Sequence, residues 1–475
     1  MPEQKRRKRL GTSTIVLALL VAGCAATGSG GCSFGLGGSA PASDAVVYRN
    51  FTLIDGGDRD PVQQAAMVVE KGRVTWAGPA ADLQAPEGAA TTDLNGAFVI
   101  PGLINLHAHL GNTVDFVQDR KFHTRESVEQ DLRTFASYGV TTVVSMGTDQ
   151  DTIFPLRNDQ RAAFAKVSAA STEDEAPPAP PAMSRVYTAG QGLMFEGGYG
   201  GLAGVNDAAA TPEEAAAYVN AQLDKGADFI KLWLDSELET MPKMPPAITQ
   251  AIIDAAHKRN ARVLAHIFYL EDAKRLVEQG VDGFVHSVRD QPVDQALIDA
   301  MLKNGTWQAA ATLSREAAMF AYGSTPPFAN DPFLTRSVSA KTLELINSPE
   351  RQKTVAGGPN FKKFPAFFET AKANLKRLVD AGVPFAAGTD SGPPGRFSGY
   401  FDHWELELMV AAGLTPTQAL DAATRRAAMF LSAEDLGTLE SSKWADFVVL
   451  DANPLEDIKN SRKIRAVYIA GSQVR

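Results

Sequence analysis

Six side chains of this sequence have types and positions that could bring them together in one metal-binding site. His107 and His109 stand two residues apart in the stretch FVIPGLINLHAHLG, where an apolar run ends. Because side chains two apart on a strand point to the same face, both imidazoles would face one site. The other four candidates lie in later apolar runs: Lys231, His266, His286 and Asp390. Neutral imidazole and carboxylate are good ligands for an ion such as Zn²⁺, so the pattern predicts a metal site.

A buried cluster of this kind needs something that satisfies its polar groups. A single histidine is more often a packing residue than a ligand, and the chain holds only seven histidines. Four of them beside an aspartate and a lysine would be costly to bury unless they were paired. A divalent ion satisfies the imidazoles and the carboxylate directly, which favours ligation over packing.

Lys231 does not fit a simple ligand set, because an ammonium group cannot ligate a metal and its charge would repel one. One interpretation is a buried lysine paired with Asp390. The other is that CO₂ has converted the amine of Lys231 to a carbamate, an anionic group whose two oxygens can bridge two ions. The residues alone leave both interpretations open.

The elements that would position these side chains follow a repeating pattern. Eight short apolar runs of strand type occupy residues 98–107, 141–146, 185–190, 229–233, 263–267, 283–287, 307–312 and 384–390. Helical patterns between most of them indicate a parallel sheet covered on both faces. Eight repeats predict an α/β fold, a (β/α)8 TIM barrel, with an open doubly wound sheet as the alternative. The carboxyl ends of barrel strands form the active-site face, and every candidate ligand lies at or near such an end.

Both ends of the predicted barrel, at 98–435, are flanked by β-type sequence. Residues 44–97 and 436–475 show short strands with turns, including the hairpin VVEKGRVTWAG, in which Gly72 supplies the turn conformation. We expect both segments to form one small, β-sandwich-like domain. Two insertions interrupt the barrel pattern: residues 168–183, expected to be an exposed loop, and residues 314–365, expected to be a lid or an oligomer contact.

The N-terminal sequence predicts a targeting segment. Residues 5–9 are all basic, and the apolar run IVLALLVA that follows is short for a membrane span. The next residues, LVAGC, resemble the lipobox of bacterial lipoproteins and end at Cys24. We therefore expect a signal peptide at 1–23, lipidation of Cys24, a flexible tether at 24–43, and an extracytoplasmic, membrane-anchored protein on the periplasmic side or the cell surface. An ordinary signal peptide is the alternative.

Composition narrows the classes of partner and chemistry. The net charge is −9 and the pI is about 5.4, which does not favour binding to nucleic acid. Hydrophobic residues make up 44% of the chain, enough for a large core. No cysteine follows Cys32, so the body of the protein has neither disulfides nor thiol chemistry.

The segments INLHAHLG, GADFIKLW, VLAHIF, VDGFVHS and AAGTDSG, in this order, resemble the amidohydrolase superfamily. More narrowly, they resemble its prolidase-like and imidazolonepropionase-like branch, and the resemblance covers residues 44–475. The C-terminal sequence from HWELELMVAAGLTPTQALDAATRRAAMFL onward supports it. The motif set is specific for the superfamily but says little about the substrate.

The resemblance implies a binuclear site with two divalent ions, expected to be Zn²⁺. His107, His109 and Asp390 would hold one ion and His266 and His286 the other, with a carbamate on Lys231 and a hydroxide as bridges. The hydroxide would attack the metal-polarised carbonyl carbon of a small substrate, such as a dipeptide, an N-acyl amino acid or a cyclic amide, and the C–N bond would then break. Asp390 would move the proton to the leaving amine.

Other interpretations stay open at this point. The same site could hydrolyse a lactone or a phosphate ester, or hold a single ion beside an unmodified Lys231. The chain could also be a non-catalytic, lipid-anchored barrel, and a homo-oligomer is compatible with the sequence.

Residues that would contact substrate are harder to predict than ligands. Tyr199 lies in GGYG where the family often has GGHG, which weakens any transfer of substrate from relatives. Tyr269 follows His266 by three residues, and His403 begins the helix after the last strand. We predict that these three side chains contact the substrate, with packing at the helix start as the alternative for His403. Two further candidates, for pairing a substrate carboxylate, are Arg315 and Arg396.

Overall fold

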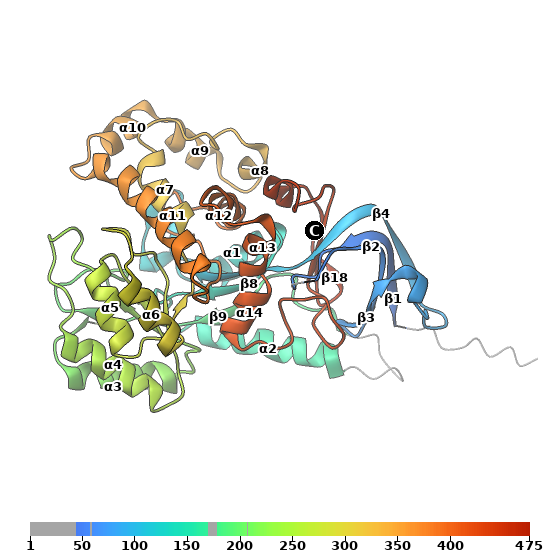
Figure 1. Ribbon diagram of the computed structural model, residues 1–475, viewed down its shortest axis with the longest axis horizontal. Coiled ribbons are helices and arrows are strands. Elements are labelled where there is room, and N and C mark those ends of the chain that lie inside the picture. The colour runs from blue at the N-terminus through green and yellow to red at the C-terminus, as the bar shows by residue number, and fades with distance from the viewer. Residues whose placement is uncertain (1–43, 58, 170–177, 207) are drawn as a thin grey trace, which may run out of the picture. The chain divides into compact units, whose positions relative to one another are not determined.

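The computed structural model describes residues 44–57, 59–169, 178–206 and 208–475 (Figure 1). These residues belong to one unit, 43–475. The predicted signal peptide, the tether and Cys24 lie outside the described residues, as do residues 170–177 of the 168–183 insertion. Among the helices that the structure describes, none has the length and apolar character needed to cross a membrane.

Strands from both ends of the chain form a single seven-stranded sheet in the order β18-β17-β16-β4-β1-β2-β3. Its central strand, β4, pairs with β1 in parallel and with β16 in antiparallel fashion. Figure 1 shows the blue N-terminal strands beside the red C-terminal segment. The strands are β1 (Val46–Leu53), β2 (Val62–Glu70), β3 (Arg73–Pro79), β4 (Ala90–Pro101), β16 (Phe447–Leu450), β17 (Ile464–Ile469) and β18 (Ser472–Gln473).

A tight turn and an aromatic cluster explain this sheet locally. Glu70 pairs with Arg73 across a two-residue turn whose Gly72 has φ +74°, as the sequence pattern predicted. The rings of Tyr48, Phe447 and Tyr468 meet in the core, with centroids between 4.3 and 5.4 Å apart. The N-terminal and C-terminal segments therefore share one hydrophobic core.

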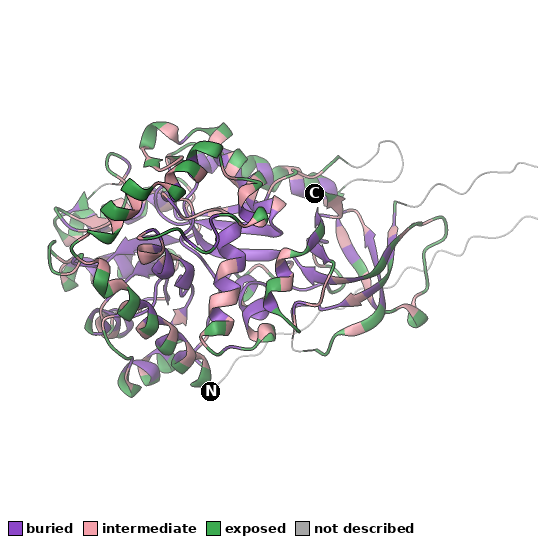
Figure 2. Ribbon diagram, turned by 90° about the horizontal axis from the view of Figure 1, so that it is seen from above, coloured by how far each residue is buried: buried purple, intermediate pink, exposed green. Residues whose placement is uncertain are grey.

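Parallel strands make up the middle of the chain. One sheet has the order β5-β8-β9 and a second the order β12-β13-β14-β15. All residues of β5, β8, β12 and β13 are buried, and Figure 2 shows these inner strands surrounded by helices with exposed outer faces. The strands are β5 (Leu103–Ala108), β8 (Val140–Ser145), β9 (Arg185–Thr188), β12 (Ile230–Trp233), β13 (Val263–His266), β14 (Gly283–Phe284) and β15 (Trp307–Gln308).

Backbone contacts join these sheets to one another. The amide of Asp228 donates to the carbonyl of Thr188 at 2.8 Å, which links β9 to the segment before β12. At the other end, Gln308 forms a parallel bridge with Phe385. Beyond Phe385 the chain reaches β5 again, where Ala108 bridges Ser391. Neighbouring strands thus follow chain order, and the last apolar run lies next to the first.

Helices connect the strands, and several begin at capping residues. Thr124 and Thr211 each form a capping box with the third helical residue, and Asp294 caps α6, which ends at Gly305 with φ +68°. The helices of the first six connections are α1 (Arg125–Ser137), α2 (Ile153–Ala169), α3 (Pro212–Asp224), α4 (Pro246–His257), α5 (Leu270–Glu278) and α6 (Gln295–Asn304). Short strands in the loops are β6 (Thr113–Val114), β7 (Val117–Gln118), β10 (Met194–Phe195) and β11 (Ala208–Ala209).

The insertion after the seventh run folds into short helices with a core of their own. Tyr322, Phe328 and Leu334 pack there against Tyr400 and Phe401. Figure 1 shows these orange helices beside α12. The remaining helices are α7 (Leu313–Ala321), α8 (Pro332–Thr335), α9 (Ala340–Asn347), α10 (Pro349–Ala356), α11 (Phe364–Asp380), α12 (Tyr400–Ala411), α13 (Pro416–Ala422) and α14 (Arg425–Leu431).

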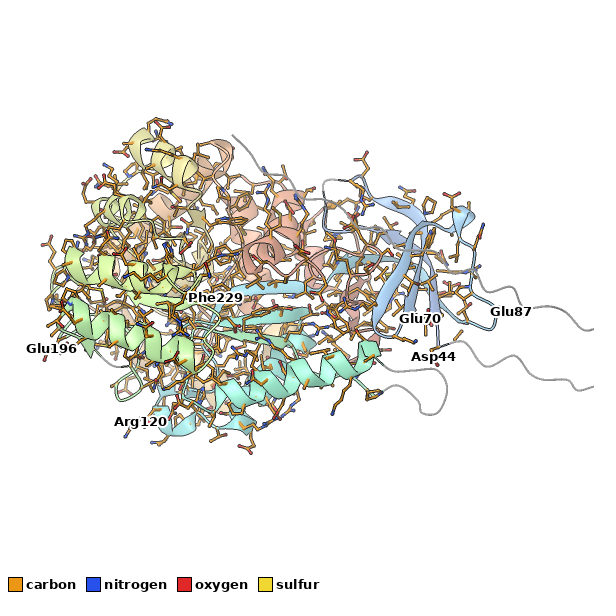
Figure 3. The ribbon with its side chains drawn as sticks, turned by 90° about the horizontal axis from the view of Figure 1, so that it is seen from below. Asp44, Glu70, Glu87, Arg120, Glu196 and Phe229 are labelled. Carbon is orange, nitrogen blue, oxygen red and sulfur yellow. The ribbon has the colours of Figure 1, made fainter. Side chains whose placement is uncertain are left out.

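Stacked aromatic side chains fill part of the interior. Phe229 stacks on Phe430, with ring centroids 6.0 Å apart, and both are buried. Arg120 and Glu196 are exposed at the periphery (Figure 3). The apolar interior around the parallel strands is the setting in which the polar ligand candidates occur.

Candidate metal centre

The structure places His107, His109 and Asp390 close enough to share one metal ion. One ligand atom of each lies within 4.8 Å of the others, and all three residues are buried. Nε2 of His109 is 3.0 Å and Nε2 of His107 is 3.6 Å from Oδ1 of Asp390. Two imidazole nitrogens and a carboxylate oxygen are a donor set suited to Zn²⁺ or a similar ion.

Hydrogen bonds hold the two imidazoles in orientation. Nδ1 of His107 donates to the carbonyl of Val285 at 2.9 Å, and Nδ1 of His109 lies 2.8 Å from the hydroxyl of Thr148. Because a carbonyl can only accept, the proton of His107 sits on Nδ1 and the lone pair of Nε2 is free. Partners on the second ring nitrogen commonly orient metal-binding histidines in this way.

Asp390 reaches the histidines through a closely packed backbone turn. Its φ is +54°, and its amide donates to the carbonyl of His107 at 2.7 Å. A Cβ on Gly388 would lie 2.8 Å from the amide nitrogen of His107, and one on Gly392 would lie 1.8 Å from the carbonyl oxygen of His109. Glycines therefore let this turn pass directly against β5.

His266 and His286 continue the cluster. Their ring centroids are 4.2 Å apart, and His286 is 4.9 Å from His107. Nδ1 of His286 lies 2.8 Å from the hydroxyl of Thr312, and Nε2 of His266 lies 2.9 Å from Oδ2 of Asp235. The four imidazoles thus form one continuous array.

Lys231 is fully buried on β12, and its Nζ has no hydrogen-bond partner among the described residues. Burial lowers the pKa of Lys231 to about 7. A Cβ on Gly147 or Gly192 would lie 3.0 Å or less from its Cγ, so both glycines pack against its stem. The described residues show no Lys231–Asp390 ion pair, so the predicted pairing is not seen. A buried, unpartnered amine fits a group that acquires its partner when a cofactor binds.

The surroundings of the cluster favour the protonation states in which imidazoles and carboxylates bind metal ions. Burial lowers the pKa of His107 and His286 well below the usual value, and that of His266 to about 4. Burial alone would raise the pKa of Asp390, but Arg396, His107 and His109 outweigh it and hold the pKa well below its usual range. Neutral imidazoles and an ionised carboxylate are the forms that bind metals.

A cavity of about 340 Å³ is lined by the four clustered histidines and by Asp390. Tyr199 forms part of its wall, with its ring 5.1 Å from that of His266. The loop that carries Tyr199 packs tightly, because a Cβ on Gly200 would lie 2.3 Å from Cγ of Trp233. Of the predicted substrate contacts, Tyr199 and Arg396 are the two that the structure places in this cavity.

Comparison of the sequence with protein-family models identifies the amidohydrolase family. The family's sequence model matches residues 98–474. The chain belongs to the amidohydrolase family. The resemblance seen in the ligand motifs is therefore confirmed at the level of the family. Members of this family generally bind divalent metal ions, which agrees with the donor set of His107, His109 and Asp390.

Individual amidohydrolases show how far the likeness extends. Ochratoxinase of Aspergillus niger is 24% identical over 467 residues, covering 89% of this chain and 84% of that protein. Imidazolonepropionase of Cupriavidus taiwanensis is 36% identical over 120 residues, so the match covers 24% of this chain and only 28% of that relative. A crystal structure of a Xaa-Pro dipeptidase with bound methionine superposes with a TM-score of 0.67 at 21% identity, covering 90% and 99% of the two chains. These likenesses show a fold of the TIM-barrel type.

Two other predicted substrate contacts lie outside this amidohydrolase cavity. The ring nitrogens of His403 lie 2.8 Å from the carbonyl of Tyr138 and 2.9 Å from the hydroxyl of Ser461. His403 thereby joins α12 to neighbouring elements, which is the packing alternative. The hydroxyl of Tyr269 lies 2.9 Å from that of Ser236, and neither residue lines the cavity.

Sequence reasoning missed the residues that orient the candidate ligands. Asp235 lies just beyond the carboxyl end of β12 and contacts His266. Its position four residues after Lys231 is a signal that could have identified it, because the active-site face lies at such ends. Thr148 and Thr312 carry no comparable signal, since hydroxyls in loops have many roles.

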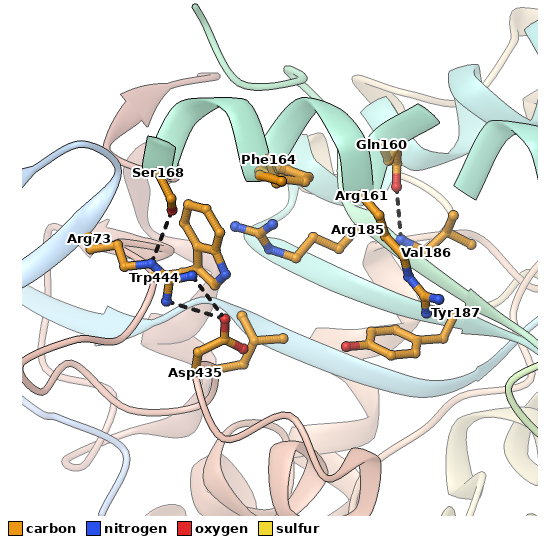
Figure 4. Close-up of a pocket in the computed structure, with 12 residues that line it drawn as sticks. Arg73, Gln160, Arg161, Phe164, Ser168, Arg185, Val186, Tyr187, Asp435 and Trp444 are labelled. Atoms are coloured by element: carbon orange, nitrogen blue, oxygen red, sulfur yellow. Dashed lines mark hydrogen bonds and ion pairs between the residues drawn. The ribbon is translucent and has the colours of Figure 1, made fainter. Parts of the chain in front are cut away.

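A second cavity, of about 270 Å³, lies between α2, β9 and the seven-stranded sheet (Figure 4). Its charged groups are already paired. Arg185 lies between the rings of Phe164 and Trp444, at 3.5 and 4.4 Å, and forms a 3.0 Å ion pair with Asp446. Arg73 stacks on Trp444 at 3.9 Å. We assign these contacts to packing between the seven-stranded sheet and the parallel strands.

Proposed function

We propose that this chain is a metal-dependent amidohydrolase that cleaves a C–N bond of a small substrate, either an amide or peptide bond or that of a cyclic amide. The observation that carries the proposal is the clustering of His107, His109 and Asp390 beside the imidazoles of His266 and His286. Family membership supports it, because residues 98–474 match the amidohydrolase family.

The residues fit a pair of divalent ions. His107, His109 and Asp390 would hold one ion, and His266 and His286 the other. A carbamate on Lys231 would be a ligand for both ions. This role would explain why the buried Nζ of Lys231 has no hydrogen-bond partner among the described residues. Bound divalent ions, Zn²⁺ by preference for this donor set, would lower the pKa of a water molecule and polarise the substrate carbonyl.

The side chains of the protein have distinct tasks in this proposal. Asp390 is ionised before substrate binds, so its carboxylate can accept a proton and pass it to the leaving amine. Asp235 and Thr312 keep His266 and His286 in orientation through their hydrogen bonds. Tyr199 and Trp233 supply aromatic walls that limit access of water to the scissile bond.

We further propose that the eight parallel runs close into a (β/α)8 barrel at 98–435 with a small β domain built from 44–97 and 436–475. Strand neighbours in chain order and the return of residues 385–391 to β5 support the barrel. An open doubly wound sheet would reverse its strand order at one point, and the described strands show no reversal. The ligands then come from the carboxyl ends of several strands.

For the N-terminus we propose a lipoprotein signal at 1–23, with lipid attached to Cys24 and the enzyme anchored outside the cytoplasm. The support is the LVAGC sequence after a basic and apolar segment. Expression of the full chain and of a Cys24→Ala variant, followed by membrane fractionation, tests the anchor. Lipid-dependent membrane association is expected for the natural chain, and membrane retention of the variant would contradict it.

Metal analysis combined with a substrate panel tests the catalytic proposal. We expect about two divalent ions per chain and hydrolysis of at least one dipeptide, N-acyl amino acid or cyclic amide. If the enzyme hydrolysed only lactones or phosphate esters, the proposal that it cleaves a C–N bond would be wrong. A metal-free protein inactive on the whole panel would favour a non-catalytic role.

A further inference from the structure

The two carboxylate oxygens of Asp390 face different partners. Oδ1 lies 3.0 Å from Nε2 of His109. Oδ2 lies 3.6 Å from Nε of Arg315 and contacts Nη1 of Arg396. Arg396 lines the same cavity as the histidines. One oxygen of Asp390 therefore belongs to the ligand set, and the other faces a pair of guanidinium groups.

The carboxylates near Arg315 and Arg396 do not fully neutralise the positive charge of these two guanidinium groups. Glu316 contacts Arg315 at 2.7 Å and also Arg289 at 3.1 Å, so one carboxylate serves two guanidinium groups. Within the described part of the chain, the one ion-pair partner of Arg396 is Asp390. Nε of Arg315 has no hydrogen-bond acceptor there. If Asp390 shares its charge with a metal ion, guanidinium charge remains available for another anion.

We propose that Arg396, backed by Arg315, binds the free α-carboxylate of the substrate. This inference rests on the proposed function and narrows it to N-acyl amino acids and dipeptides, in preference to neutral cyclic amides. A guanidinium group can donate two parallel hydrogen bonds to a carboxylate, which recognises both its charge and its planar shape. Bound in this way, the carboxylate places the neighbouring C–N bond over the histidine array.

Local structure holds both arginines in place before substrate arrives. The amide of Gly392 donates to the carbonyl of Arg396 at 2.8 Å, closing the turn that follows Asp390. Gly395 in this turn has φ +78°, and a Cβ there would lie 3.0 Å from Phe116 and from Tyr322. The turn is therefore packed from outside and presents Arg396 to the cavity.

Arg315 is positioned by the start of α7. The carboxylate of Glu405, on α12, accepts hydrogen bonds from the amides of Leu313 and Ser314 at 2.9 and 2.7 Å. Glu405 thus caps the first turn of the helix that carries Arg315. A preorganised guanidinium pair loses less entropy on binding a carboxylate than a flexible one would.

Matched substrates that differ only at the carboxylate test the proposal. Each active N-acyl amino acid or dipeptide is compared with its C-terminal carboxamide on the metal-loaded enzyme. We expect kcat/KM to be at least about tenfold higher for the free acid. Arg396→Gln should bring the ratio close to one, mainly by raising KM for the acid, and Arg396→Lys should restore part of it. Arg125→Gln, at an exposed ion pair with Asp159, is the control and should keep the natural ratio.

A binding measurement separates this inference from the proposed function. Calorimetric titration uses a reduced-amide analogue, which cannot be hydrolysed, with a free carboxylate or with a carboxamide. Tighter binding of the acid that Arg396→Gln abolishes supports the carboxylate subsite even if no amide is hydrolysed. Equal binding of both analogues, or an acid preference that survives in Arg396→Gln, would overturn it. Thermal unfolding of each variant shows whether it is folded.

Discussion

Nε2 of His109 lies 3.0 Å from Oδ1 of Asp390, although the two residues come from the first and the last of the parallel runs. This contact therefore depends on the last run returning to the first, as the bridge between Ala108 and Ser391 also shows. The parallel strands between them must fold for these two residues to meet. Metal affinity at this pair should consequently report on the integrity of the whole set of parallel strands.

Replacement of Asp390 by Asn should remove both a ligand charge and the proposed proton carrier. We expect Asp390→Asn to lower kcat by about 10³-fold, within the range measured for loss of general acid–base groups, and to reduce metal content. The measurements are steady-state kinetics on an identified substrate and elemental analysis. Asp159→Asn is the control, because Asp159 is an exposed carboxylate paired with Arg125. Normal turnover by Asp390→Asn would exclude the proton role.

Lys231 should carry a carbamate in the metal-loaded enzyme. Its amine is buried and unpartnered, and its pKa is lowered to about 7, so the neutral form that reacts with CO₂ is accessible. After reconstitution with ¹³C-bicarbonate and Zn²⁺, the NMR spectrum should show one carbamate carbon. Lys231→Ala should lack that signal and lose activity and at least one ion per chain.

The exposed Lys225 offers a matched control for this experiment. Lys225 forms an ion pair with Asp151 at 2.8 Å on the surface. Lys225→Ala should keep the carbamate signal, the metal content and the activity. A Lys231→Ala enzyme that retains both ions and full activity would contradict the bridging role.

The clustering of the candidate ligands could be predicted from sequence because strand geometry restricts their positions. The two-residue spacing of His107 and His109 places both side chains on one face of a strand. Lys231, His266 and His286 interrupt apolar strands, where burial of a polar group is costly unless the group has a partner. Family membership confirms the resemblance that these motifs carried. The orientation of the imidazoles was not predictable, because Thr148 and Thr312 lie in loops whose course depends on tertiary packing.

His403 shows the limit of such reasoning. Its place after the last parallel run indicated a cavity residue, but a helix start gives no direction for the side chain. In the structure its imidazole is directed toward Tyr138 and Ser461, away from the histidine array. The sequence predicted Arg315 and Arg396 as candidates for pairing a substrate carboxylate, but their convergence on one oxygen of Asp390 required the fold.

Gly392 should be essential for the position of His109. A Cβ at Gly392 would lie 1.8 Å from the carbonyl oxygen of His109, and its φ of +112° disfavours any other residue. Gly392→Ala should lower the free energy of unfolding by about 3 kcal/mol or more and weaken metal binding. Denaturant unfolding and metal titration measure the two effects.

Gly96 provides the matched control for the clash. Its φ is +73°, but a Cβ there would meet nothing within 4 Å. Gly96→Ala should therefore cost only the backbone strain, about 1 kcal/mol, and leave metal binding unchanged. Equal losses of stability in Gly392→Ala and Gly96→Ala would show that the close approach to His109 does not matter.

His403 should make the fold sensitive to acid. Burial lowers its pKa to about 3 in the folded protein, whereas the unfolded chain has a pKa near 6.5. Between these values the unfolded state binds more protons, so stability is complete above pH 6.5 and falls as the pH is lowered toward 3. From pH 7.5 to pH 5 the loss attributable to His403 should be about 2 kcal/mol.

Urea unfolding of metal-free protein at pH 7.5 and pH 5 isolates this contribution when the natural chain is compared with His403→Gln. The glutamine amide can still hydrogen-bond to Tyr138 or Ser461 but does not titrate in this range. Protonation of the other buried histidines also destabilises the fold at low pH. These histidines are present in both proteins, so their contributions to the loss of stability cancel in the comparison. Acidification should therefore destabilise the natural chain by about 2 kcal/mol more than the variant. Parallel losses in the two proteins would mean that His403 does not remain neutral on folding, and that its two hydrogen bonds stabilise a charged imidazole instead.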